Sequence, residues 1–398
     1  MSIIKKRIEQ FSRIYHSEVV AIRRYIHANP ELSFQETNTA AFICRKLDEY
    51  GIPYQSGIAK TGIVGLIEGK RKDKVIALRA DMDALPITEL NDVPYKSKNE
   101  GVMHACGHDA HIAVLLGAAR ILNEMKEYLD GTVKLIFQPS EESFPGGAKA
   151  MIEEGVLHNP EVAHVIGEHV LPTLDAGKIG FRPGMYMAST DEIYITVFGK
   201  GGHGATPDLN IDPVVIASHI LISLQQIVSR QANPTIPTVL SFGRVIADGR
   251  TNIIPDKVIM EGTLRTFDEN WRKKAHQKIE EIATNTAQAF GGKCEIHIAH
   301  GYPFVENHPN LTARLKRYAI EFLGPRKVVD LDMRMTAEDF AYFTQALPSV
   351  FYRLGTKTKK KEVTNLHTAQ FDIDEESLHI GMGVMAYMAY RQLEEMID

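Results

Sequence analysis

The segment from His104 to His111 places three histidines, one cysteine and one aspartate within eight residues. Neutral imidazole and thiolate are ligands that zinc-like divalent metals prefer. A hydrophobic core has little use for so many titratable groups side by side, so the segment predicts a metal site. The competing interpretation is a helix N-terminus that Asp109 caps, with the histidines facing solvent.

A pair of glutamates follows a predicted buried strand. Residues 133–137 form a short apolar run bounded by turn residues, which is typical of a buried strand. Glu141 and Glu142 come shortly after it, and adjacent side chains point in different directions. One carboxylate can therefore bind a metal while the other faces the water that the metal activates. Alternatively, Ser140 caps a helix and both glutamates lie in its first turn.

A histidine follows another short apolar run. Residues 162–166 predict a second buried strand, and Gly167-Glu168-His169 comes directly after it. His169 is thus a metal-ligand type at a strand end. A single histidine in this position is weak evidence on its own, and its weight comes from the two clusters described above.

Helical and strand patterns alternate up to about residue 180. We predict helices over 8–28, 36–50, 110–125 and 148–154, and strands over 64–68, 75–79, 133–137 and 162–166. Such alternation predicts an α/β fold with a mainly parallel sheet. In folds of this class the loops at the strand ends carry the functional site.

The middle of the chain has a different pattern. The predicted order is a strand over 192–198, a helix over 213–230, strands over 238–245 and 257–265, a helix over 271–289 and a strand over 294–299. This β-α-β-β-α-β order is typical of a small ferredoxin-like domain. The remaining chain is helix-rich, with a last strand at 349–354 and a closing helix at 376–393. We therefore predict an inserted lid and dimerisation domain, with hinges near 180–189 and 300–306. The insertion spans 186–300, and the catalytic domain comprises 1–185 and 301–398.

Composition narrows the function classes. With 398 residues and 44% apolar content, the chain can bury a large core and divide into two domains. A net charge of −5 argues against a nucleic-acid partner, and the basic run 357–361 is interpreted as a solvated turn. The sequence shows no secretory signal and no apolar run near the ~20 residues that span a bilayer, so no membrane partner is expected. The cysteines Cys44, Cys106 and Cys294 cannot form a disulfide framework and suit a reducing cytoplasm.

Five motifs occur in a fixed order over nearly the whole chain. They are Arg79-Ala80-Asp81-Met82-Asp83-Ala84-Leu85-Pro86, the Cys106/His108 segment, Gln138 to Glu142, Gly201-Gly202-His203, and Thr336 to Ala341. Together they resemble the M20 metallopeptidase family, in the amidohydrolase branch of aminoacylases, hippurate hydrolases and indole-acetyl-amino-acid hydrolases. The resemblance implies an enzyme that cleaves the amide bond of an N-acyl amino acid to a carboxylic acid and a free amino acid.

The resemblance also implies two divalent metal ions per subunit, of zinc, manganese, cobalt or nickel. Cys106 stands at the place of a cysteine that bridges both ions, and Asp83 is expected to orient a ligand histidine. The other implied ligands are His108, Glu142, His169 and His367. The wider family usually has an aspartate bridge and a His-x-Asp motif in place of residues 81–83, so the departure weakens a strict expectation of zinc.

The implied catalytic groups are Glu141 and His203. Glu141 matches the general base, which takes a proton from water and later passes it to the leaving amine. Glycines on both sides of His203 allow a tight backbone that presents its imidazole to an oxyanion, although a turn histidine without a role is the alternative. Asn252 and Arg265 are predicted to bind substrate, Arg265 through a carboxylate. The alternative for Arg265 is a surface charge on an exposed sheet.

Family members dimerise through the inserted domain, and the matching histidine often reaches the partner's active site. We therefore expect a homodimer or higher oligomer with a small-molecule substrate. Glu338 and Asp339 match a family motif, but a capping role for a helix over 337–344 explains them equally well. A metal dipeptidase or an N-carbamoyl amino acid hydrolase is the rival enzyme. A catalytically silent binding protein is the rival of another class, and the presence of Glu141 counts against it.

Overall fold

The computed structural model describes residues 3–358 and 365–396, which fall into two compact units. Unit 1 comprises Met1–Tyr186, Glu306–Met333 and Asp339–Asp398, and unit 2 comprises Met187–Val305 and Arg334–Glu338. Most of the basic run 357–361 lies outside the described residues; its first residue, Lys357, ends a strand. Among the described residues, no helix is both long and apolar enough to cross a membrane.

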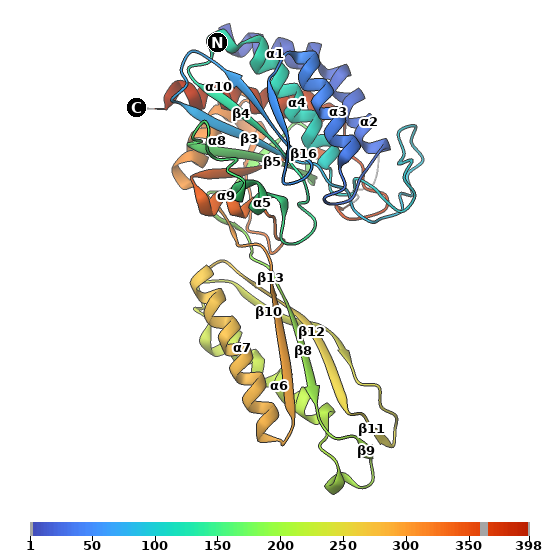
Figure 1. The fold of residues 1–398 in the computed structure, drawn as a ribbon. Helices are drawn as coiled ribbons and strands as arrows, with labels where there is room; N and C mark the ends of the chain where they lie inside the picture. Colours follow the sequence, from blue (N-terminus) through green and yellow to red (C-terminus); the bar gives the residue numbers. More distant parts are fainter. Residues whose placement is uncertain (1–2, 359–364, 397–398) are drawn as a thin grey trace. The chain divides into compact units, whose positions relative to one another are not determined.

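Unit 1 is built on a sheet whose order, among the described residues, is β1-β2-β4-β3-β5-β16-β6-β15 (Figure 1). The strands are β1 (Tyr54–Ile58), β2 (Gly62–Glu68), β3 (Val75–Asp81), β4 (Thr132–Gln138), β5 (His164–Asp175), β6 (Ile179–Phe181), β15 (Val328–Asp330) and β16 (Ser349–Lys357). The central strands β4, β3, β5 and β16 run parallel. Every residue of β3 and β4 is buried, because helices cover both faces. The predicted α/β fold with a mainly parallel sheet is confirmed.

Helices pack on both faces of this sheet. They are α1 (Ile3–Ile14), α2 (His16–Ala28), α3 (Thr37–Tyr50), α4 (His108–Glu124), α5 (Gly147–Glu153), α8 (Pro309–Leu323), α9 (Ala341–Ala346) and α10 (Glu376–Glu395). The long helices α4 and α10 lie side by side on one face, and the short α5 and α9 lie on the other (Figure 1). On the second face the ring of Phe340 stacks on Phe351 of β16, with centroids 4.8 Å apart. Tight packing on both sides fixes the positions of the central strands.

Three predicted elements differ from the structure. The helix expected over 8–28 is two helices, α1 and α2, because the helix is interrupted at Tyr15. The strand expected at 162–166 continues to Asp175, since β16 pairs with it as far as Asp175, so His169 lies within β5 and not at its end. The helix expected over 337–344 begins only at Ala341.

Unit 2 contains an antiparallel sheet of order β10-β12-β8-β13. Its main elements are β8 (Asp191–Phe198), α6 (Pro213–Gln226), β10 (Thr238–Ile246), β12 (Lys257–Thr266), α7 (Glu269–Ala289) and β13 (Lys293–His300). Ile193, Ile195 and Val197 alternate along β8 and pack against α6 and α7, as the period of two in a strand requires. The other face of the sheet carries polar and exposed side chains.

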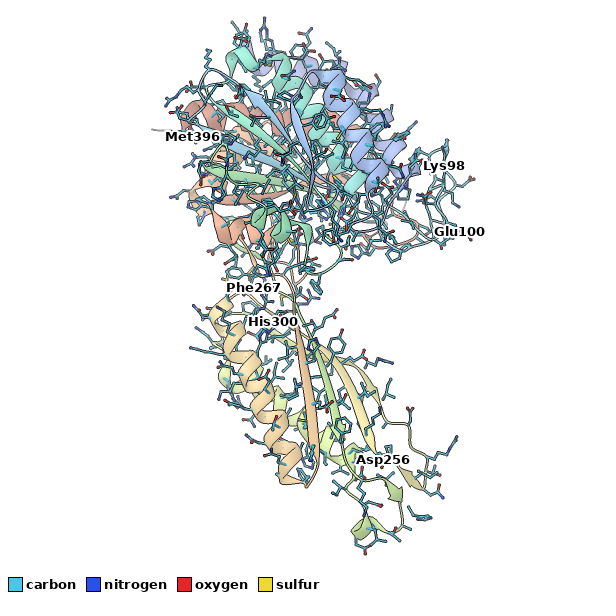
Figure 2. The ribbon with its side chains drawn as sticks, viewed as in Figure 1. Lys98, Glu100, Asp256, Phe267, His300 and Met396 are labelled. Carbon is cyan, nitrogen blue, oxygen red and sulfur yellow. The ribbon has the colours of Figure 1, made fainter. Side chains whose placement is uncertain are left out.

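Short strands complete the described chain. They are β7 (Gly184–Met187), which pairs with β14 (Val305–Asn307), and β9 (Gly202–His203), which pairs with β11 (Ile253–Ile254). Figure 2 shows Asp256 toward the β9–β11 end of unit 2, with Phe267 and His300 at the opposite end of its sheet. The backbone of Arg334 also pairs with Met187 and Ala188, which explains why residues 334–338 belong to unit 2.

Candidate metal centre

Cys106 and His108 flank the glycine that begins helix α4. Gly107 has a φ of +88°, and a Cβ placed on it would lie 2.5 Å from Val170 Cγ2. Only glycine tolerates both the left-handed backbone and this close approach. The turn therefore packs directly on β5, one residue away from His169.

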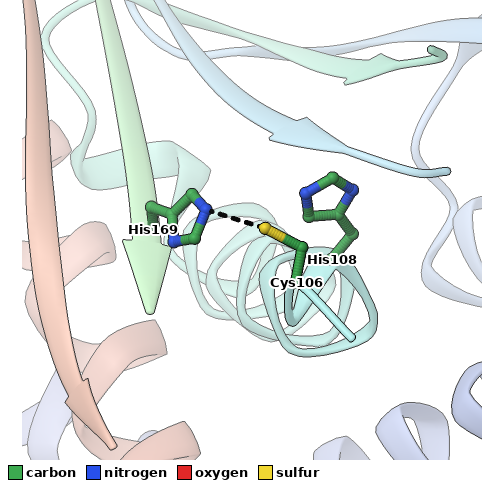
Figure 3. A group of neighbouring side chains, drawn as sticks. All are labelled: Cys106, His108 and His169. Carbon is green, nitrogen blue, oxygen red and sulfur yellow. Dashed lines mark hydrogen bonds between the residues drawn. The ribbon is translucent and has the colours of Figure 1, made fainter. Parts of the chain in front are cut away.

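Three buried side chains converge at this turn (Figure 3). Cys106 Sγ lies 3.4 Å from His169 Nε2. Cys106, His108 and His169 each offer a ligand atom, and these atoms lie within 4.8 Å of one another. Cys106 also belongs to a second such group, with Glu142 and His367. The thiol is thus the member that the two groups share.

The glutamate pair is not helical. Ser140 has a φ of +50°, and the N–H groups of Glu141 and Glu142 donate to the two carboxylate oxygens of Asp83, each at 3.0 Å. The predicted alternative, a helix capped by Ser140, is wrong because Asp83 satisfies these backbone groups. The same Asp83 carboxylate lies 3.3 Å from His108 Nδ1, so it contacts both the glutamate loop and the start of α4.

His367 reaches the centre from the C-terminal part of unit 1. Its backbone N–H donates to the carbonyl of Ala105 at 2.8 Å, and its own φ is +60°. His367 Nε2 lies 3.2 Å from Glu142 Oε1, and its side chain is 52% exposed. The structure thus brings together the five ligands that the resemblance implies, and His367 is the one nearest to solvent.

Negative charge dominates the buried part of the centre. Burial alone would lower the pKa of His108, but Asp81 and Asp83 raise it to about 10. Burial, followed by the charge of Glu142, raises the pKa of the Cys106 thiol well above its ordinary value. A bound cation reverses both effects, since it offsets the carboxylates and deprotonates a coordinating thiol.

The polar atoms of the centre suit a metal ion. Both ring nitrogens of His108 and the Oε1 atom of Glu142 are buried without a hydrogen-bond partner. Such atoms are rare in folded proteins and need an explanation. Nitrogen, sulfur and oxygen ligands at one place fit zinc, manganese, cobalt or nickel. These residues therefore fit divalent metal ions.

The competing interpretation of the histidine cluster is wrong. His104, His108 and His111 are all buried and do not face solvent. Asp109 does not cap α4: its Oδ2 atom accepts hydrogen bonds from Arg23 Nε and from His27 Nδ1, both at 2.7 Å. Asp109 instead links the first turn of α4 to α2.

The other predicted site residues lie in unit 2. His203 pairs with Ile253 between β9 and β11, and Gly204 N–H donates to the Asn252 carbonyl at 2.9 Å. His203 is exposed, and its Nδ1 accepts a hydrogen bond from the N–H of Ala205 at 3.0 Å. In the neutral ring the proton therefore sits on Nε2, which is left free to donate.

Arg265 lies on β12, on the face of the sheet that the helices leave open. It lines an open pocket of about 420 Å³, and its Nε donates to Thr263 Oγ1 at 3.3 Å. Burial lowers its pKa. Within the described part of the chain, no carboxylate forms an ion pair with Arg265. Its guanidinium is therefore available to an anionic ligand.

The structure also shows polar residues to which the sequence gave no role. Arg79 Nη2 donates to Asp339 at 2.8 Å and Arg79 Nη1 to Asp81 at 2.7 Å. Asp339 also accepts the N–H of Ala148 at 2.9 Å, so the predicted capping role for this carboxylate is wrong. Buried arginines rarely stand without a carboxylate, and Arg79 within the apolar strand β3 was the signal available in the sequence.

Comparisons with known proteins agree with this geometry. The model of peptidase family M20/M25/M40 matches residues 77–391. YhaA of Bacillus subtilis (strain 168), which is named as an amidohydrolase, is 42% identical over 396 residues, covering 99% of this chain and 100% of that protein. The N-acyl-L-amino acid amidohydrolase of Geobacillus stearothermophilus is 42% identical over 304 residues, covering 76% of this chain and 82% of that protein.

A solved structure is similar over almost the full length. The crystal structure of a dinuclear metal binding peptidase of the M20 family from Bacillus subtilis has a TM-score of 0.83 and 35% identity, covering 96% of this chain and 100% of that chain. The family resemblance predicted from the five motifs is thereby confirmed. The chain belongs to peptidase family M20/M25/M40, and it is a metal-dependent amide hydrolase.

Proposed function

We propose that this enzyme hydrolyses the amide bond of N-acyl amino acids and releases a carboxylic acid and a free amino acid. The observation that carries the proposal is the sharing of Cys106 between two ligand groups, with Glu141 next to the ligand Glu142. The name of the relative from Geobacillus stearothermophilus supports this substrate class.

In this proposal the centre holds two divalent ions per subunit. Cys106, His108, Glu142, His169 and His367 would hold them, since they form two ligand groups that share Cys106. Bound zinc, manganese, cobalt or nickel would supply the lowered pKa of water, toward about 7, and the polarisation of the amide carbonyl. Asp83 is proposed to hold the His108 ring and the backbone of Glu141 and Glu142 in position.

Glu141 is proposed as the proton carrier. Its carboxylate is largely buried, and Oε2 lies 3.9 Å from His108 Nε2, at the edge of the ligand group. It takes one proton from the attacking water, whose oxygen forms the new bond to the acyl carbon. It then gives this proton to the amide nitrogen as the carbon–nitrogen bond breaks. The water is consumed, and Glu141 returns to its ionised form.

His203, Asn252 and Arg265 are proposed to act on the substrate from unit 2. The Nε2–H group of His203 is free to donate to the oxyanion that forms on the acyl oxygen. Arg265 is proposed to bind the carboxylate of the amino acid, because it has no ion pair of its own within the described residues and guanidinium binds carboxylates in bidentate fashion. Asn252 is proposed as a neighbouring substrate contact, because it directly precedes β11, which pairs with the strand β9 that carries His203.

We further propose a homodimer or higher oligomer formed through unit 2, and a cytoplasmic location. The three cysteines are unpaired, which suits a reducing compartment. Sedimentation of the purified protein tests the oligomeric state, and a monomer at micromolar concentration would contradict the first part. Fractionation of cells tests the second part.

The substrate class is tested with metal-depleted protein reconstituted separately with zinc, manganese, cobalt or nickel. Each form is assayed on N-acetyl and N-benzoyl amino acids, on free-amine dipeptides and on N-carbamoyl amino acids. We expect the highest kcat/KM on the N-acyl amino acids and none in metal-free protein. Preference for dipeptides would favour the dipeptidase alternative, and preference for N-carbamoyl substrates the carbamoylase. Binding without turnover of any substrate would indicate a silent relative.

A further inference from the structure

His111 is a fully buried histidine of the metal-centre motif for which the proposed function has no use. It lies in the first turn of α4, three residues after His108. Its Nδ1 atom lies 2.6 Å from Asp81 Oδ1, and its Nε2 atom accepts the backbone N–H of Val170 at 2.9 Å. Because a backbone N–H can only donate, Nε2 must be unprotonated. The ring proton is therefore on Nδ1 and is donated to Asp81.

Val170 connects His111 to a proposed metal ligand. The carbonyl of Val170 lies 2.8 Å from His169 Nδ1, so it accepts the ring proton of His169. This bond fixes the tautomer of His169 and directs the lone pair of Nε2 toward Cys106 Sγ, 3.4 Å away. The backbone of one residue thus receives a hydrogen bond from His169 and gives one to His111.

Hydrogen bonds also hold the residue that faces the Nδ1 side of His111, which is Asp81. Asp81 accepts a second hydrogen bond from Arg79 Nη1 at 2.7 Å, and Arg79 Nε donates to Gln138 at 2.8 Å. Arg79, Asp81 and Gln138 are fully buried and come from neighbouring strands β3 and β4. His111 therefore joins a rigid pair of strands to the part of β5 that carries His169.

We propose that His111 is a positioning residue, and not a metal ligand, which holds the Val170 backbone so that His169 Nε2 points at the metal centre. The inference rests on the metal site of the proposed function. It assigns a role to the third histidine of the cluster. The Asp81 carboxylate binds the Nδ1–H group of His111, on the opposite side of the ring from the Nε2 atom that accepts the Val170 N–H.

The rival is that His111 binds a metal itself. Asp81, His108 and His111 each offer an atom, and these atoms lie within 4.8 Å of one another. Coordination by Nε2 would take the lone pair that now accepts the Val170 N–H, and coordination by Nδ1 would displace the proton that Nδ1 donates to Asp81. Each route removes a hydrogen bond from a buried polar group, which is unfavourable.

Two amide substitutions separate these roles. The oxygen of His111→Gln reaches the position of Nε2 and keeps an acceptor for Val170. The amide of His111→Asn reaches only the position of Nδ1, so it keeps the bond to Asp81 and leaves the Val170 N–H unpaired. Metal number per chain is measured by elemental analysis, and metal affinity by competition with a chromophoric chelator. Melting of the metal-free proteins reports any purely structural effect.

We expect both variants to bind as many ions as the wild-type enzyme. His111→Asn should bind them about 10–100-fold more weakly, which is the usual effect of losing a partner behind a ligand, whereas His111→Gln should stay within about threefold of wild type. One ion fewer in both variants would show that His111 is a ligand. Wild-type affinity in His111→Asn would show that the Val170 contact has no positioning role.

The wild-type protein provides the control for the proposed function. Absence of metal binding in the wild-type protein would overturn the proposed function itself, independently of the result for the variants. If His111→Asn fails to fold, His111→Gln alone decides, because loss of an ion or of affinity in it overturns the inference and wild-type values sustain it.

Discussion

Each unit contains a cluster of side chains of metal-ligand type, but of these two clusters only the one around Cys106 has the properties of a metal site. In unit 2, Asp191, His276 and His300 offer atoms within 4.8 Å of one another, as the Cys106 group does in unit 1. Asp191, however, accepts two hydrogen bonds from Arg272, at 2.8 and 2.6 Å, and one from His276 at 2.7 Å. A guanidinium already occupies the place that a metal ion would take.

The difference lies in which polar atoms have partners. Around Asp191 the charge of the carboxylate is offset by Arg272, and burial alone would raise the pKa of Asp191, but hydrogen bonds from Arg272 and His276 lower it to about 2. In the metal centre, neither nitrogen of His108 makes a hydrogen bond, although the carboxylates of Asp81 and Asp83 lie within 3.7 and 3.3 Å of them. A count of histidines and carboxylates cannot distinguish the two clusters. The hydrogen bonds that these side chains make do distinguish them.

The largest expected effect is on turnover at the metal centre. Glu141→Gln should lower kcat by about 10²–10⁴-fold, as loss of a general base does, because the amide cannot take the proton from water. Steady-state kinetics give kcat, and elemental analysis of the same preparation gives the number of bound metal ions per chain. Metal number should stay at the wild-type value, since Glu141 is not a proposed ligand. A variant with near-normal kcat would show that another residue is the base.

The next effect tests whether unit 2 contributes a catalytic group. His203→Ala should lower kcat by about 10²–10³-fold, the usual effect of removing one oxyanion donor, with metal number unchanged. If His203 acts in the partner subunit, a mixture of Glu141→Gln and His203→Ala proteins should recover activity. In the mixed dimer one centre then receives both an intact Glu141 and an intact His203. No recovery, once subunit exchange is verified with labelled protein, would place His203 in its own chain or outside catalysis.

The Asp191 cluster should affect stability and not metal binding. Asp191→Asn should lower the free energy of unfolding at pH 7 by about 2–4 kcal/mol, since it removes the fully buried carboxylate partner of Arg272 and leaves only the more exposed Glu269 as its ionic partner. The pKa of Asp191 is depressed in the folded state, so its stabilisation is present above its ordinary pKa near 4 and is lost as pH falls toward 2. Denaturant unfolding should therefore show the gap between variant and wild type narrowing from pH 5 to pH 3. Loss of an ion from Asp191→Asn would contradict the contrast drawn between the clusters.

The smallest expected effect concerns substrate affinity. Arg265→Ala should raise KM for an N-acyl amino acid about tenfold, equivalent to about 1.4 kcal/mol, with little change in kcat. The matched control is the corresponding N-acyl amino acid amide, which has no carboxylate and should show no change. A second control is Arg244→Ala, since Arg244 lines the same pocket but is paired with Glu261. Equal effects on both substrates would make Arg265 a structural residue of the sheet.

The local patterns allowed most of the fold to be predicted. Residues 75–79 of β3 and 133–137 of β4 are apolar apart from Arg79 and Lys134, and helix α7 begins at the cap Asp268 with a clear helical period. The break at Tyr15 was not predictable, because the apolar period continues through it. The extension of β5 beyond Ile166 depends on pairing with β16, which lies far away in the sequence.

The candidate site could be predicted less completely than the fold from local sequence patterns. The cluster from His104 to His111 indicated a metal, but the sequence could not show which histidine faces it. His367 has no local signal, and only the family resemblance pointed to it. The roles of Asp81 and His111 depend on hydrogen bonds between strands and a helix, and such bonds are properties of the tertiary structure.

The place of β16 inside the unit 1 sheet has a consequence for synthesis on the ribosome. Strand β16 pairs with β5 on one side and with β6 on the other, and His367 and α10 follow it in the sequence. Unit 2 has all its residues once Glu338 has been added, whereas unit 1 still lacks β16 at that point. The nascent protein can therefore assemble its complete set of candidate ligands only after unit 2 has been synthesised and His367 has been added.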